Sequence, residues 1–73
     1  MSKRAYRSVL GTDVPNNGTY YELRDDRERV VAVVFRSHVT GEFEIDVRSE
    51  MAPRHIIMGF IEHAKKGLAK RDA

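Results

Sequence analysis

Two acidic residues, Glu44 and Asp46, have the side-chain type and the spacing that general acid–base chemistry needs. They lie two positions apart in the segment Phe43-Glu44-Ile45-Asp46-Val47-Arg48, so on a strand their carboxyl groups share one face, roughly 6–7 Å apart. Such carboxyl pairs act as general acid and base only where a pocket holds a substrate. A flat strand in a chain of 73 residues offers no such pocket. We therefore expect a solvated acidic face and no catalytic residues.

The three histidines, His38, His55 and His63, are the residues best suited to bind a metal in this chain, which has no cysteine. His55 and His63 are eight residues apart on an expected helix, which separates them by about 12 Å along its axis. A zinc site needs three or four converging ligands. The serines lack a Gly-x-Ser-x-Gly context, and no glycine-rich phosphate loop is present. The sequence therefore predicts a protein that is not an enzyme and has neither a metal nor a cofactor.

Positive charge gathers near the two ends of the chain, although the net charge is only +2. A surface that combined both ends would suit phosphate groups, and Tyr6, Tyr20 and Tyr21 would add stacking. Cations near a helix C-terminus also complement the helix dipole without any ligand. Nucleic-acid binding is therefore the alternative hypothesis, and its candidate contacts are Lys3, Arg4, Arg7, Lys65, Lys66, Lys70 and Arg71.

A protein partner is the first hypothesis, because a small sheet leaves an open edge and the start of the expected helix gathers the apolar side chains of Met51, Ile56 and Met58. Edge strands expose unpaired backbone groups, and grouped apolar side chains mark contact surfaces. Acidic residues on the outward sheet face would also repel phosphate. We expect a small regulatory, inhibitor or accessory protein whose partner is another protein or a second copy, with no membrane and no small-molecule substrate. The candidate contact residues are Glu42, Glu44, Asp46, Met51 and Met58.

Alternating and continuous apolar runs predict the strands that must position these residues. Phe43, Ile45 and Val47 alternate with polar residues, as in a half-buried strand. The β-branched run 30–35 predicts a central strand, and residues 19–24 predict another. Pro15-Asn16-Asn17-Gly18 is typical of a hairpin turn, which requires a fourth strand within residues 6–12. Gly11, Gly18 and Gly41 are interpreted as turn or bulge residues.

The C-terminal segment changes to a helical period. Ile57, Phe60, Ile61, Ala64 and Leu68 form one apolar stripe, and Pro53 suits a first helical turn. Gly59 lies beside this stripe, so we expect it to allow close approach of the helix to the sheet. The expected core combines the helix stripe with Leu23, alternate residues of 30–35 and the apolar side chains of the 43–48 strand.

The predicted fold is α+β: an antiparallel β-meander of three to four strands followed by one C-terminal amphipathic helix packed on one sheet face. A small β-barrel with a C-terminal helix is the alternative architecture. We expect residues 1–73 to form a single domain, with a disordered N-terminus at 1–5 and a frayed C-terminus at 70–73. No apolar stretch follows the basic N-terminus and cysteine is absent, so we expect a cytoplasmic location.

Overall fold

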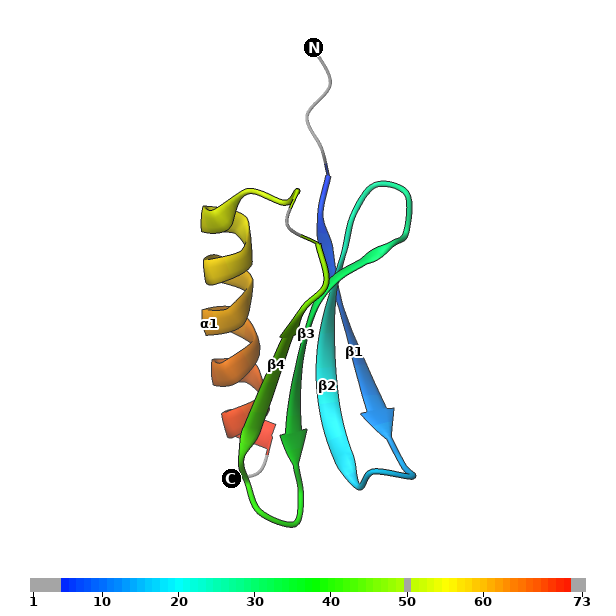
Figure 1. Ribbon diagram of the computed structural model, residues 1–73. Helices are drawn as coiled ribbons and strands as arrows, with labels where there is room; N and C mark the ends of the chain where they lie inside the picture. The colour runs from blue at the N-terminus through cyan, green and yellow to red at the C-terminus, as the bar shows by residue number, and fades with distance from the viewer. Residues whose placement is uncertain (1–4, 50, 72–73) are drawn as a thin grey trace.

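The computed structural model describes residues 5–49 and 51–71, which form a four-stranded antiparallel sheet and one helix (Figure 1). The elements are β1 (Arg7–Asp13), β2 (Gly18–Arg24), β3 (Val30–Ser37), β4 (Phe43–Val47) and α1 (Arg54–Arg71). This order confirms the predicted α+β meander with a C-terminal helix. The predictions for the chain ends, 1–5 and 70–73, fall largely outside the described residues and stay predictions.

The sheet is open, with its strands in the order β1-β2-β3-β4. Each strand pairs antiparallel with its neighbour in the sequence, and β1 confirms the fourth strand expected within residues 6–12. Within the described residues β1 and β4 have one neighbour each, so they form the two edges. The barrel alternative is therefore wrong: four strands enclose too little space for a filled interior, and the helix covers one face instead.

The hairpin turns follow from local side-chain hydrogen bonds. In the β1–β2 turn Asn17 takes the positive φ of 50°, and the Asp13 carboxylate accepts a hydrogen bond from the Asn16 side-chain amide at 2.8 Å. Gly18 does not supply the turn dihedral, because it already pairs with Asp13 as the first residue of β2. In the β2–β3 loop the Asp25 carboxylate accepts backbone hydrogen bonds from Arg27 and Arg29, both at 2.9 Å.

Helix α1 packs on one side of the sheet (Figure 1), mainly over the two central strands β2 and β3. A helix with its side chains is about 10–12 Å wide and strands are about 4.8 Å apart, so one helix covers roughly two strands. The buried core reflects this width, since it draws on β2, β3, the segment before α1 and the helix stripe but on no residue of β4. Its members are Leu23, Val31, Ala32, Val34, Ala52, Phe60, Ala64 and Leu68.

Two expectations about the core need correction. Ile45 and Val47 do point to the helix side, but they remain 46% and 47% exposed because β4 lies beyond the helix. Gly59 is exposed and a β-carbon there would meet nothing within 4 Å. The close approach occurs at Gly67, where a β-carbon would lie 2.7 Å from the Tyr21 hydroxyl oxygen.

Candidate functional site

The sheet face opposite the helix, here called the open face, carries the most chemically distinctive surface. Strand register places alternate residues of all four strands on it: Val9 and Gly11 of β1, Tyr20 and Glu22 of β2, Val33 and Phe35 of β3, and Glu44 and Asp46 of β4. None of the side chains that form the buried core belongs to this set. The open face is therefore available for contacts outside the domain.

Two aromatic rings lie flat against the centre of the open face. Tyr20 faces Gly11 on β1 and Phe35 on β3. A β-carbon at Gly11 would overlap the Tyr20 ring, and one at Gly18 would overlap the Phe35 ring. The two glycines thus leave the space in which the rings lie down, and the interpretation of Gly11 and Gly18 as turn or bulge residues is wrong. Tyr20 and Phe35 form what we call the aromatic floor.

A shallow groove runs over the aromatic floor, and carboxylates surround it. Its lining includes Asp13, Glu22, Glu42 and Glu44 together with Tyr20, Val33 and Phe35. Asp13 accepts the turn hydrogen bonds from Asn16, and Glu22 accepts two hydrogen bonds from the Arg24 guanidinium, the shorter at 2.9 Å. Glu42 and Glu44 are exposed and form no salt bridge with any residue that the structure describes. The groove therefore has uncompensated negative charge at the β4 side.

The opposite end of the open face is held by paired charges. The Arg7 guanidinium hydrogen-bonds to both carboxylate oxygens of Glu28, and Arg24 lies 3.7 Å from the same carboxylate. The hydrogen bond from Arg7 lowers the pKa of the Glu28 carboxyl below its usual value. On β4 the Arg48 guanidinium bonds to Asp46 at 2.9 Å. Because Glu28 and Asp46 are paired with arginines, the carboxylates of Glu42 and Glu44 carry the unpaired negative charge of the groove.

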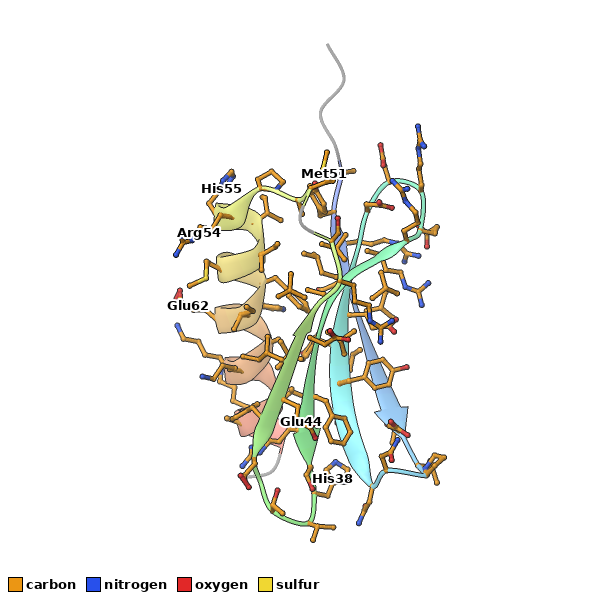
Figure 2. All side chains as sticks on the ribbon, in the orientation of Figure 1. His38, Glu44, Met51, Arg54, His55 and Glu62 are labelled. Atoms are coloured by element: carbon orange, nitrogen blue, oxygen red, sulfur yellow. The ribbon has the colours of Figure 1, made fainter. Side chains whose placement is uncertain are left out.

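The five residues predicted as a protein-contact face do not form one surface. Glu42 and Glu44 line the open-face groove, and Asp46 shares their strand face. Met58 lies on helix α1, on the other side of the sheet, and is 52% exposed. Met51 lines a second hollow with Tyr6 and Asp25 beside the segment that precedes α1. Figure 2 shows Met51 at the opposite end of the molecule from Glu44.

The predicted basic contacts are also divided. Arg7 lies on β1, paired with Glu28, whereas Lys65, Lys66 and Lys70 are exposed in the C-terminal half of α1. The ammonium of Lys65 lies 5.5 Å from the centre of the Phe43 ring. Lys3 and Arg4 are outside the described residues, and Arg71 ends the helix. The described part of the chain therefore does not join Arg7 and the helix lysines into one basic patch.

The residues considered for catalysis and metal binding are spread over the molecule. Glu44 and Asp46 share a face of β4, as expected, but the partner of Asp46 is Arg48. His38 shares a 2.7 Å hydrogen bond with the Thr19 hydroxyl. The rings of His63 and Tyr21 pack in a T-shaped arrangement with their centroids 5.5 Å apart. His38 and His55 lie at opposite ends of the molecule (Figure 2). Among the described residues no three His, Asp or Glu side chains gather around a common point that could hold a metal ion.

The sequence placed Glu42 and Glu44 on one face, but it did not indicate Asp13, Glu22 or the aromatic floor of the groove. It grouped Tyr6, Tyr20 and Tyr21 as stacking residues, yet only Tyr20 lies on the open face. Tyr21 points to the helix side, where it contacts His63 and lies beneath Gly67. The missing signal was the pairing register, since Gly11 becomes the neighbour of Tyr20 only when β1 pairs with β2.

Comparison of the chain with protein-family models, with curated proteins and with solved structures found no match. In the described residues, no helix combines the length and the apolar character that crossing a membrane requires.

Proposed function

We propose that this chain is a non-enzymatic cytoplasmic binding protein whose open-face groove takes a positively charged segment of a partner protein. One observation carries the proposal: the exposed carboxylates of Glu42 and Glu44 stand beside the aromatic floor of Tyr20 and Phe35 in one groove. A regulatory, inhibitor or accessory role of this kind would rest on such contacts and would need no reaction chemistry in the chain itself.

The groove suits lysine and arginine side chains for two reasons. Their charged ends are attracted to carboxylates, and their cationic or planar groups stack on aromatic rings, which adds about 0.5–2 kcal/mol per contact depending on exposure. Arg48 also lines the groove, but its guanidinium already bonds to Asp46. An extended segment with several basic residues would therefore find separate anionic positions along an apolar base.

We expect Glu42→Lys to weaken binding of a fluorescein-labelled lysine- and arginine-rich peptide by about threefold to tenfold at low salt. Each exposed ion pair contributes up to about 1 kcal/mol, and the reversal replaces attraction by repulsion. Fluorescence anisotropy at two salt concentrations measures the change, and the loss should shrink at the higher salt because exposed charges are screened.

The matched control is Glu62→Lys, which changes the net charge equally on the helix face that points away from the sheet (Figure 2). A second variant, Tyr20→Leu, removes the central ring and keeps the carboxylates. The proposal requires that Glu42→Lys and Tyr20→Leu both weaken binding while Glu62→Lys leaves it within about twofold of the wild type. Equal effects of Glu42→Lys and Glu62→Lys would show that only net charge matters and would overturn the groove as the site.

Nucleic-acid binding is the second proposal, and it rests on the exposed lysines of α1. Lys65, Lys66 and Lys70 are exposed on one helix, which gives a short row of cations without Arg7. Phosphate binding of this kind falls steeply with salt. The same anisotropy measurement with labelled single-stranded and duplex DNA tests it, and charge reversal of the three lysines should abolish any signal. No detectable affinity at low salt would end this proposal.

A further inference from the structure

The outer edge of β4 presents unpaired backbone groups. Hydrogen bonds from Arg48 N to Val31 O and from Ser37 N to Glu42 O flank the β3–β4 ladder, so the even-numbered residues of β4 direct their backbone groups to β3. Phe43, Ile45 and Val47 consequently direct their N–H and C=O groups to the open edge. Within the described residues no other strand pairs with this edge. Such an edge is a template for another strand.

Apolar side chains accompany this open edge on the helix side of the sheet. Ile45 is 46% exposed and Val47 47%. Helix α1 leaves them uncovered because it packs mainly over β2 and β3. Lysine and proline do not occur in β4, and its two charged side chains, Glu44 and Asp46, lie on the open face, so they do not cover Ile45 and Val47 on the helix side. A partner strand would therefore gain both backbone hydrogen bonds and apolar contacts.

The charges of β4 select which strand fits. An antiparallel copy of β4 paired about Ile45 would set Glu44 against the partner's Asp46, which brings like charges together. Pairing about Asp46 instead sets Glu44 against the partner's Arg48, twice by symmetry, and Ile45 against the partner's Val47. The two Asp46 carboxylates meet at the axis, where each already bonds to its own Arg48. The strand is thus complementary to itself in this register.

We propose that two copies of this chain pair through β4, antiparallel about Asp46, to form a dimer with a continuous eight-stranded sheet. The interface is isologous, since the same residues contribute from both copies. Both helices lie on one side of the joined sheet, and both open faces form its other side. This inference goes beyond the proposed function, because it concerns the β4 edge and not the binding of a cationic segment to the groove.

The experiment uses two charge-reversal variants. Each variant should pair poorly with a second copy of itself, whereas the two variants should pair well with each other. Arg48→Glu alone sets Glu44 against a partner glutamate, and Glu44→Lys alone sets Arg48 against a partner lysine. In a mixture of the two variants, every such pair in the mixed dimer again joins opposite charges. Sedimentation velocity measures the dimer fraction of each variant and of the equimolar mixture, and one variant with an affinity tag shows whether the two chains co-purify.

We expect the wild type to dimerise, each single variant to dissociate about tenfold or more readily, and the mixture to recover the dimer. Arg27→Glu and Glu62→Lys, at exposed positions away from β4, give the same charge changes and should leave the dimer unchanged. Circular dichroism confirms that the variants fold, and recovery in the mixture is itself a second control, because misfolded chains would not recover.

Two outcomes would overturn the dimer. One is a wild type that stays monomeric at about 1 mM, and the other is a mixture no more dimeric than its components. Neither outcome affects the groove proposal. That proposal is tested by peptide anisotropy with Glu42→Lys, and Glu42 lies outside β4. Loss of the peptide response with a normal dimer would conversely remove the groove proposal alone.

Discussion

Asp25 shows how a single carboxylate organises a loop of this protein. It is only 8% exposed and accepts hydrogen bonds from the backbone N–H groups of Arg27 and Arg29 and from the Arg29 side chain. The backbone hydrogen bond from Arg29 is the main reason why the pKa of Asp25 is lowered from its usual value. The same loop holds Glu28 at a positive φ of 64°, which is uncommon for a residue other than glycine. Asp25 thus fixes a loop conformation that its neighbours do not favour.

Asp25→Asn should destabilise the fold at neutral pH and weaken the dependence of its stability on acid. The folded-state pKa of Asp25 lies below the unfolded-state pKa, so its ionised form stabilises the folded state above the unfolded pKa of about 3.9. That contribution is lost as the pH falls through the lower folded-state pKa. Urea unfolding between pH 7 and pH 2 measures the effect. Asp26→Asn, an exposed neighbour in the same loop, should behave as the wild type; an Asp25→Asn curve parallel to the wild type would contradict the role of Asp25.

The helix and the sheet differ in width, and this mismatch determines which surfaces the elements leave free. Helix α1 approaches β2 closely at Gly67, beside the Tyr21 hydroxyl. Over β4 it leaves Ile45 and Val47 half-exposed, while Lys65 and Arg36 both lie near the Phe43 ring, at 5.5 and 5.2 Å from its centre. Arg36 also donates a hydrogen bond to the Leu68 carbonyl at 3.2 Å. The helix is therefore anchored along its inner face, and the β4 side remains available to a partner.

The two helix glycines should respond oppositely to alanine. Gly59→Ala adds a methyl group where nothing lies within 4 Å, so the better helix propensity of alanine should stabilise the fold by about 1 kcal/mol. That gain corresponds to a rise in Tm of roughly 4–8 °C for a domain of this size. Gly67→Ala places its β-carbon 2.7 Å from the Tyr21 hydroxyl oxygen, and the necessary shift should remove or reverse the gain. Thermal unfolding followed by circular dichroism compares them; equal gains would show that α1 does not approach Tyr21 closely.

The whole molecule has a small core for the surface it must support. In the part of the chain that the structure describes, eight side chains form the buried cluster, and of these Leu68 and Val34 are the large ones that are completely enclosed. Domains of this length are typically stable by only about 4–11 kcal/mol. A dimer through β4 would add stability that grows with protein concentration, because association shifts the folding equilibrium. The limited core and the exposed edge are thus linked, because pairing at the edge would supply stability that the core does not.

Leu68→Ala should remove a large share of the stability, about 2–5 kcal/mol, because it leaves a cavity under the C-terminal half of α1. Met58→Ala, at a half-exposed position of the same helix, should cost less than about 1 kcal/mol at low protein concentration. Urea unfolding at one low concentration measures both. A Leu68→Ala midpoint close to that of Met58→Ala would contradict the position of Leu68 in the core.

The sequence by itself determined the elements of this protein. Alternation in the 43–48 segment, the β-branched run at 30–35 and the helical stripe from Ile57 to Leu68 are local patterns, and local conformation follows from them. The turn residues Pro15 and Asn17 even required the first strand, which β1 confirms. The acidic face of β4 was predictable for the same reason, since side chains two apart on a strand share a face.

Only the tertiary structure decided which of these side chains meet. Register placed Gly11 beneath Tyr20, and the pairing of Arg7 with Glu28 joined residues 21 positions apart. The width of one helix left Ile45 and Val47 exposed although their alternation is typical of buried positions. Periodicity describes each element separately, whereas neighbours across strands and coverage by the helix depend on how complete elements pack together. For that reason the acidic residues were identified from the sequence, and the aromatic floor and the self-complementary edge were not.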